Sequence, residues 1–378
     1  MTHPYEDIPP EGFWRSGVVE TDRMDWPGLH KPKFHLTHTT RVATAGSCFA
    51  QHIGRYLRLA GINVLDGEPA PKGMGEELAT RFGYGLYSAR YGNIYTARQM
   101  RELLEDAMAG RVDKRLFLTR KGRWYDMLRP GVEPTGCASL EEAMELRRAH
   151  LEAVLALISS TDVLVFTLGL TEGWIDKRAG KTLAMAPGVI AGRYRERRFA
   201  FHNFSYDEVL EDLRETLRLM QELNPNIKLL LTVSPVPLTA TASGDHVLSA
   251  SSYSKSVLRA AAGDVAAGEA AVDYFPSYEI VTSTAMAATA YEANLRGVTQ
   301  EMVETVMGVF LVAHGLLDAL AEMEAGETAH GARAGSDVDL RGLRALSGPA
   351  ETDEEDADVE APEDELICEE ALLEALRK

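Results

Sequence analysis

Strand-like apolar runs alternate with amphipathic helical patterns, and this alternation constrains the fold most. Residues 161–169 read Thr-Asp-Val-Leu-Val-Phe-Thr-Leu-Gly, a nearly continuous apolar run that ends in glycine, and residues 139–160 before it have helical apolar spacing. Similar short runs occur at 42–45, 227–233 and 272–275. Continuous apolar strands preceded by helices are typical of βαβ units buried on both faces. The pattern predicts an α/β fold with a mostly parallel sheet.

Further elements follow from helix-cap and turn signals. Thr96 is placed to cap a helix over about 97–108, and helices are also predicted over 205–223, 252–267 and 299–323. A short second strand is expected at 61–66, and the glycine-punctuated residues 110–137 favour a hairpin. The basic residues 175–204 read as an irregular segment or solvated hairpin.

The turn Gly46-Ser47-Cys48 joins the first strand run to a helical pattern with Phe49 and Ile53 on its apolar face. In an α/β protein this is the carboxyl edge of the sheet, where backbone N–H groups and the positive end of a helix dipole converge. A thiol placed there loses its proton more readily than a free cysteine. Cys48 is therefore a candidate nucleophile.

The same stretch resembles the signature of the GSCFA family, Gly-Ser-Cys-Phe-Ala at residues 46–50. Four later segments strengthen the resemblance, which spans roughly residues 3–312 and is nearest to the proteobacterial branch: residues 87–96, 166–174, 232–238 and 274–280. The family is similar to the SGNH/GDSL hydrolases. The resemblance implies a three-layer α/β/α sandwich and acyl-group chemistry.

Matching the family to the SGNH blocks assigns roles to single residues. Cys48 takes the place of the nucleophilic serine and Ser47 that of the aspartate before it. Gly92 is the residue most like the glycine that binds the oxyanion, and Asn93 beside it is a second donor, although a plain Gly-Asn turn is the alternative.

The third SGNH block, Gly-X-Asn-Asp, is altered here to Gly169-Leu-Thr171-Glu172. Threonine can donate one hydroxyl hydrogen bond to an oxyanion, with different geometry from an asparagine amide. Glu172 is a candidate for orienting a histidine or a substrate hydroxyl; the alternative is a cap or a salt bridge.

The Asp-X-X-His element that supplies the SGNH histidine is absent from the loop after 272–275. His246, in the loop leaving the 227–233 strand, is the first choice for a general base. His52, four residues beyond Cys48 on the same helix face, is the second, and His202 is the third.

Other residues are expected to line a substrate pocket. The basic segment ends near His202 and Asn203, and its arginines are candidates for recognising an anionic group such as a coenzyme A or sugar-nucleotide phosphate. The remaining candidates for substrate binding lie at strand ends and on the following helices: Gly169, Tyr253, Lys255, Tyr278 and Glu279.

These residues predict acyl transfer from an ester or thioester through a covalent intermediate on Cys48. A water acceptor would make the protein an esterase, and a sugar or glycan hydroxyl an acyltransferase. A coenzyme A thioester is a candidate acyl donor, and no other cofactor and no metal is expected. A non-catalytic module that binds carbohydrate or protein is the rival hypothesis, and a third makes Ser47 the nucleophile.

Composition limits the partners and the compartment. The formal net charge of −18 argues against nucleic acid as a general partner. Three distant cysteines offer no disulfide framework, and neither a leader segment nor an apolar run long enough for a membrane span is visible, so a cytoplasmic location is expected.

Three regions are predicted along the chain. Residues 1–40 are rich in proline and aromatic rings and are expected to form an arm packed on the core, followed by a catalytic domain over 41–325. Residues 326–378 are expected to be disordered, since 351–365 carry ten acidic side chains and no basic one. An amphipathic pattern at 365–377 predicts a short helix that docks on a protein partner or on its own domain; the alternative is a fraying, solvated helix.

Overall fold

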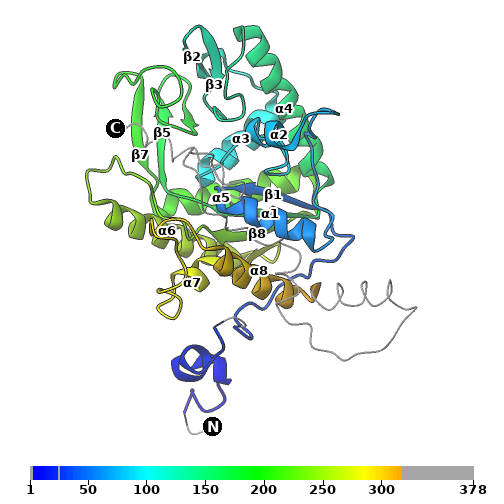
Figure 1. The fold of residues 1–378 in the computed structure, drawn as a ribbon, viewed down its shortest axis with the longest axis vertical. Helices are drawn as coiled ribbons and strands as arrows, with labels where there is room; N and C mark the ends of the chain where they lie inside the picture. The colour runs from blue at the N-terminus through cyan, green and yellow to red at the C-terminus, as the bar shows by residue number, and fades with distance from the viewer. Residues whose placement is uncertain (1–2, 24–25, 317–378) are drawn as a thin grey trace, which may run out of the picture.

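A four-stranded parallel sheet forms the centre of the computed structural model, which describes residues 3–23 and 26–316 (Figure 1). The strands are β1 (Val42–Gly46), β4 (Val163–Leu168), β8 (Lys228–Val233) and β9 (Val272–Tyr274), in the order β1-β4-β8-β9. Val42 pairs with Val163, which pairs with Lys228, so the carboxyl ends of these strands meet at one edge. The predicted α/β class is confirmed.

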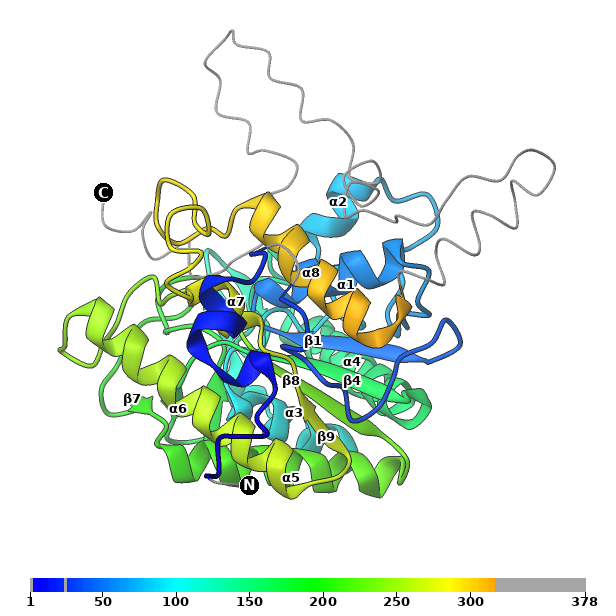
Figure 2. The same ribbon diagram turned by 90° about the horizontal axis from the view of Figure 1, so that it is seen from below.

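Helices cover both faces of this sheet (Figure 2). Val42, Val165 and Leu230 face the helices α1 (Phe49–Leu59), α7 (Ser277–Thr282) and α8 (Gln300–His314). The alternate residues Ala43, Phe166 and Leu231 face the other layer, which consists of α3 (Ala97–Ala109), α4 (Leu140–Ser160), α5 (Tyr206–Leu223) and α6 (Val247–Gly268). The strands are apolar on both sides because both sides are buried. The expected three-layer sandwich is confirmed.

Caps set the starts of most helices. Thr96 forms the capping box of α3, as predicted, Ser205 forms a second capping box for α5, and Ser139 caps α4. Helix α6 begins at Val247, before the predicted residue 252, because His246 caps it. Helix α8 ends at His314, where Gly315 adopts the left-handed conformation.

The predicted second strand at 61–66 is wrong. Val64 makes one isolated parallel bridge with Val42 on the outer edge of β1, and no ladder extends from it among the described residues. The rest of that edge is met by the coil at 87–96, in which Ser88 accepts from the Thr44 N–H through its hydroxyl (2.9 Å). Ile94 N–H donates to Gly46 O (2.8 Å).

Two small antiparallel sheets lie beyond the carboxyl edge of the main sheet. The predicted hairpin is present as β2 (Phe117–Arg120) and β3 (Arg123–Asp126). The irregular segment expected at 175–204 is wrong: it contributes to a three-stranded sheet in the order β6-β5-β7, formed by β5 (Glu172–Asp176), β6 (Lys181–Leu183) and β7 (Phe199–Asn203). Short helical segments complete the fold at η1 (Pro10–Gly12), η2 (Arg15–Val19), α2 (Glu76–Arg81) and η3 (Lys114–Leu116).

The first 40 residues divide into two parts. Trp26 and Phe34 are buried against the α1 and α8 layer, whereas Phe13 and Trp14 are exposed. The expected disordered tail over 326–378, with its terminal helix pattern and Cys368, lies outside the described residues. Within the described part of the chain, no helix is both long enough and apolar enough to cross a membrane.

Candidate functional site

The Gly46-Ser47-Cys48 turn is locked between β1 and β4. Gly46 has φ +137°, a conformation that favours glycine, and a Cβ there would lie 2.3 Å from Thr167 O. Ser47 N–H donates to the same Thr167 oxygen (3.0 Å). Cys48 is the N-cap residue of α1, so the turn sits at the positive end of that helix.

Ser47 and Cys48 have different surroundings. Cys48 is 4% exposed and belongs to the apolar cluster under α1 and α8, together with Val165 and Val236. Ser47 lies against Gly169, where an added Cβ would be 3.0 Å from Ser47 Cβ. Ser47 Oγ is buried and has no hydrogen-bond partner within the described residues. The two side chains therefore offer two different candidate nucleophiles.

The coil at 87–96 ties the turn to the loop after β4. Tyr95 O accepts hydrogen bonds from the N–H groups of Gly169 and Leu170 (3.0 Å each). Tyr87 OH donates to Asn93 Oδ1 and lies 3.2 Å from Ser47 O. These contacts hold the segment with Gly92 and Asn93 and the segment at 169–172 next to the turn.

Gly92 and Asn93 occupy the middle of this coil. Gly92 has φ +69°, which accounts for glycine at this position. Asn93 is 3% exposed, and its carboxamide oxygen is engaged by Tyr87. Gln51 Nε2 donates to Tyr87 OH (3.1 Å), so α1 also contributes to the network. Sequence reasoning named neither Tyr87 nor Gln51 as a site residue, although Tyr87 is the first residue of the family segment at 87–96.

The loop after β4 is held by buried polar contacts. Thr171 is fully buried, its N–H donates to Ser254 Oγ (2.9 Å), and its hydroxyl donates to Asn203 Oδ1 (2.6 Å). Lys255 Nζ, also buried, donates to Gly169 O (2.5 Å). Since a hydroxyl has one proton, the Thr171 donor is directed at Asn203 in this arrangement.

A pocket of about 160 Å³ opens beside this loop. Its walls combine aromatic and aliphatic side chains with Glu172 and Thr241, and include Tyr95 and Trp174. Glu172 Oε1 accepts from Thr241 Oγ1 (2.6 Å), and burial raises the pKa of the Glu172 carboxyl. Neither Trp174 nor Thr241 was predicted as a site residue. Trp174 is the last residue of the family segment at 166–174, and Thr241 lies in the loop after β8.

The histidines lie in three different settings. His246 is exposed, and its Nδ1 accepts the Leu248 N–H at the start of α6 (3.2 Å). His202 Nε2 pairs with Glu208 Oε1 (2.8 Å) on α5. The His52 ring packs edge-on against Phe49, with centroids 5.5 Å apart.

The other predicted rim residues are spread out. Tyr253 is 48% exposed on α6. Tyr278 is half-buried at the start of α7, where its carbonyl accepts from Thr282. Glu279 binds Arg259 and accepts from Tyr274 OH (2.8 Å), beside the outermost strand β9.

A second concentration of buried titratable groups lies between α3, α4 and the small sheets, and sequence reasoning missed it. His150 Nδ1 lies 2.6 Å from Glu68 Oε2, and Arg129 lies 3.9 Å from Glu68. Burial and Arg129 lower the pKa of His150 to about 4. Burial opposes ionisation of Glu68, but the hydrogen bond from His150, with Arg129 nearby, lowers its pKa to about 2.

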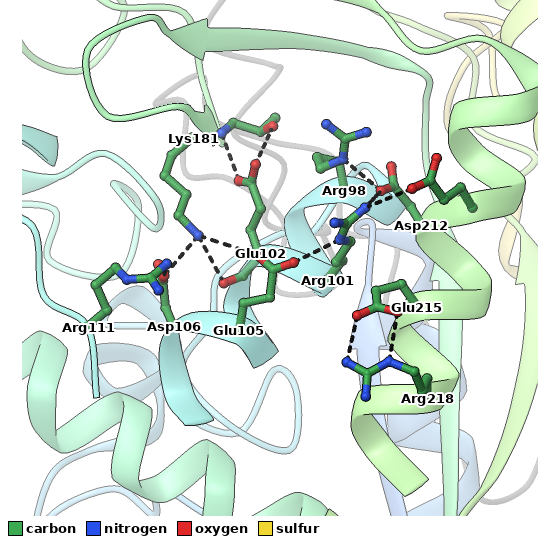
Figure 3. Close-up of polar contacts among 12 residues, drawn as sticks. Arg98, Arg101, Glu102, Glu105, Asp106, Arg111, Lys181, Asp212, Glu215 and Arg218 are labelled. Atoms are coloured by element: carbon green, nitrogen blue, oxygen red, sulfur yellow. Dashed lines mark hydrogen bonds and ion pairs between the residues drawn. The ribbon is translucent and has the colours of Figure 1, made fainter. Parts of the chain in front are cut away.

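Glu102 belongs to an adjacent layer of charges, shown in Figure 3. Burial raises its pKa to about 7, although its Oε2 accepts the Thr182 N–H (2.8 Å). Lys181 on β6 reaches over α3 to Asp106 (2.8 Å). Glu102 and His150 line a cavity of only about 20 Å³, room for a single water molecule. Across the described residues, no group of three or more His, Cys, Asp or Glu side chains is placed to hold a metal ion.

An acetyl xylan esterase, Est2A, from the rumen bacterium Butyrivibrio proteoclasticus is similar in structure at 12% sequence identity and a TM-score of 0.30, over 75% of this chain and 65% of that one. Comparison with curated proteins gave no match. The model of the GSCFA family matches residues 41–310, from the start of β1 to within α8. The chain therefore belongs to the GSCFA family.

Proposed function

We propose that the protein is an acyl-ester hydrolase or acyltransferase that works through a covalent acyl-enzyme at the Gly46-Ser47-Cys48 turn. One observation carries the proposal. Three separate segments, at 46–48, 92–95 and 169–171, meet at the carboxyl edge of the sheet around the N-terminus of α1. The positive end of the α1 dipole at this meeting point suits a developing oxyanion.

Cys48 is our first choice of nucleophile because it lies at the helix N-terminus, where a thiolate is stabilised. Its sulfur attacks the carbonyl carbon of the ester or thioester, and the carbonyl oxygen becomes an oxyanion facing backbone donors near Cys48 and Gly92. Collapse of this intermediate forms the acyl-cysteine thioester and releases the alcohol or thiol, which takes up a proton. Water or an acceptor hydroxyl then attacks the thioester and regenerates the thiol.

Glu172 supports the acceptor half of this scheme. Its carboxyl lines the 160 Å³ pocket beside the loop after β4, and burial raises its pKa towards the range useful for proton transfer. We propose that Glu172 binds the acceptor hydroxyl and takes its proton. His246 remains the alternative base, although its exposed position at the start of α6 offers less shielding from water.

The pocket also suggests an acceptor. Trp174 and Tyr95 present aromatic surface beside a carboxyl and a hydroxyl, a combination that suits a sugar ring with its hydroxyl groups. A carbohydrate acceptor is therefore proposed, with a coenzyme A thioester as the candidate donor for the transferase form.

A binding module without catalysis is the second candidate, and one observation favours it. Cys48 is 4% exposed and packs among apolar side chains, as a structural cysteine does. In that case the 160 Å³ pocket would bind its ligand unchanged.

Intact-mass spectrometry after incubation with p-nitrophenyl acetate or with acetyl-coenzyme A separates these functions. We expect an added acetyl group that is lost in Cys48→Ala, retained in Ser47→Ala and retained in the matched control Cys137→Ala. Cys137 is also buried, and burial raises the pKa of its thiol to about 11, so it should not react. An adduct lost only in Ser47→Ala would make Ser47 the nucleophile, and no adduct from either donor would favour the binding module.

The acid–base assignment needs a second measurement. Glu172→Gln should leave the acetyl adduct in place but slow its loss to water or to added sugar by about a hundredfold, the usual size of a general-base contribution. His246→Ala is the comparison, and slower deacylation in that variant alone would contradict the role of Glu172.

A further inference from the structure

Five arginines line one open hollow of about 840 Å³ beside the small sheets. Its walls come from the end of β2, the turn between β5 and β6, and the loop at 192–199 before and into β7. The cationic side chains lining it are Arg178, Arg193, Arg195, Arg197 and Arg198. Glu196 is the one acidic residue among the lining residues, in a chain whose net charge is −18.

Most of this positive charge has no partner. Arg198 is bound to Asp176 through two hydrogen bonds (2.7 and 2.9 Å). The side chains of the other four arginines make no hydrogen bond and no ion pair with any residue that the structure describes. A guanidinium stays charged at any physiological pH, so these groups repel one another until an anion neutralises them.

The backbone that carries these arginines is fixed. Gly192 N–H donates to Thr119 O (3.1 Å), and the Arg120 guanidinium donates to Ile190 O (3.0 Å), which joins the loop to β2. Lys177 Nζ donates to Glu196 O (2.7 Å), which joins the same loop to the turn after β5. The hollow is therefore formed before any ligand arrives, and this lowers the ordering cost of binding.

An aromatic ring borders the arginines. Tyr194 is 50% exposed, and its ring packs edge-on against Trp174 with centroids 5.4 Å apart. Trp174 also lines the 160 Å³ pocket, so Tyr194 lies next to a residue of that pocket and, in sequence, between two arginines of the hollow. A face of Tyr194 is thus available for stacking against a flat ring.

We propose that this hollow binds the phosphates of a nucleotide-containing small molecule, with the base on Tyr194. Guanidinium groups bind phosphate oxygens in pairs, and the four arginines of this hollow that are unpaired among the described residues fit a dense charge such as a diphosphate. A polymer with one charge per repeat would instead require cations spread along a stripe. Coenzyme A and nucleotide sugars both combine a diphosphate with a base. Their binding to the hollow does not depend on the acyl chemistry proposed above.

Isothermal titration calorimetry with coenzyme A, ADP, UDP and inorganic pyrophosphate tests the proposal on the full chain. The triple variant Arg193→Ala/Arg195→Ala/Arg197→Ala should bind each nucleotide at least about a hundredfold more weakly, because each charge-assisted contact is worth about tenfold. The matched control, Lys72→Ala/Arg148→Ala/Arg214→Ala, removes the same charge from residues outside the hollow and should bind within about threefold of the wild type.

A second variant separates the ring from the charges. Tyr194→Ala should weaken ADP or UDP about tenfold and leave pyrophosphate unchanged, because pyrophosphate has no ring to stack. A preference for coenzyme A or for UDP in the wild type then distinguishes the two sources of the phosphates.

Three results would overturn the proposal. The first is the absence of heat from all four probes at millimolar concentration. The second is a loss of binding in the matched control as large as that in the arginine variant. The third is binding of an acidic polysaccharide such as polygalacturonate through these arginines when none of the phosphates binds.

Discussion

The turn at the carboxyl edge and the charged layer beside α3 and α4 bury polar groups in opposite ways. At the turn, the buried groups are backbone amides and hydroxyls, and Ser47 Oγ and Thr167 Oγ1 have no partner among the described residues. In the charged layer the buried groups are ionisable side chains; Glu68 and Asp106 are each held by a cation or a hydrogen bond, although His150 Nε2 has no partner among the described residues. Both regions are largely shielded from solvent.

This difference distinguishes a region that can bind a ligand, the turn, from a region that only stabilises the fold, the charged layer. Strongly shifted pKa values occur at His150 and Glu102, yet the cavity between them holds no more than a water molecule. The turn carries unsatisfied hydroxyls and lies beside a loop that opens onto a 160 Å³ pocket. A perturbed pKa is therefore a guide to function only where there is also room for a ligand.

Gly46→Ala should produce the largest effect on stability. An alanine Cβ would lie 2.3 Å from Thr167 O, and φ of +137° is strained for any side chain, so we expect a loss of at least about 4 kcal/mol of unfolding free energy or no soluble protein. Gly73→Ala is the matched control, since Gly73 also has positive φ (+86°) but its Cβ would meet nothing within 4 Å. Equal urea midpoints for the two variants would show that the turn is not locked as described.

Glu68→Gln should have the next largest effect, a loss of about 3 kcal/mol at pH 7, because Arg129 and the Arg90 N–H lose a buried carboxylate. The exposed pair of Glu145 with Arg148 supplies the control: Glu145→Gln should cost under about 0.5 kcal/mol. If the two substitutions prove equal in urea denaturation, the charged layer is not a support.

The buried pair of His150 and Glu68 predicts how stability depends on pH. His150 has its pKa lowered to about 4, so between pH 6.5 and 4 the unfolded state takes up a proton first and stability falls as pH falls. Glu68 has its pKa lowered to about 2, so its contribution is present above about pH 4.5 and is lost as pH drops towards 2. Because Glu102 contributes the opposite slope between about pH 4.5 and 7, urea midpoints should decline continuously below pH 6.5 in a Glu102→Gln background, and below about pH 4.5 in the wild type.

Glu102→Gln should give the smallest change and the opposite sign. The pKa of Glu102 is raised to about 7, so as pH rises from about 4.5 to 7 the unfolded state loses its proton first and stability falls. Glutamine keeps an acceptor for the Thr182 N–H without the charge, and we expect a gain of about 1 kcal/mol at pH 8 that disappears at pH 5. Glu105→Gln, on the same helix and paired with Arg101, should lose stability at both pH values.

The main sheet could be predicted because its strands are buried on both faces. Continuous apolar runs at 163–168 and 228–233 leave no competing interpretation once helices flank them. The small sheet β6-β5-β7 was missed because its strands are short and flanked by lysines and arginines, although Phe199 and Phe201 alternate as a half-buried strand requires. The strand predicted at 61–66 is wrong because Val64 forms only a single bridge, and one bridge does not make a strand.

The candidate site is predictable only as far as strand ends determine it. Ser47, Gly169 and Thr171 follow parallel strands, and parallel strands end at one edge, so sequence reasoning placed them together. The partners Asn203 and Lys255 come from β7 and α6, and sequence reasoning named both without their contacts. Which histidine faces the turn depends on the course of loops, and no periodic pattern encodes that course.

The irregular coil along β1 has a consequence for how this protein behaves towards copies of itself. The outward-facing backbone groups of Val42 and Thr44 and the carbonyl of Gly46 already have partners: Val42 bonds to residues 63 and 65, Thr44 to Ser88, and Gly46 O to the Ile94 N–H. A straight strand would have left its own outer side ready to pair with another molecule, whereas a coil offers no such ladder. The coil that places Gly92 and Asn93 near the turn therefore also covers the β1 edge of the sheet and prevents edge-to-edge pairing there. Substitutions that loosen this coil should yield fibrous or insoluble protein as well as an altered site.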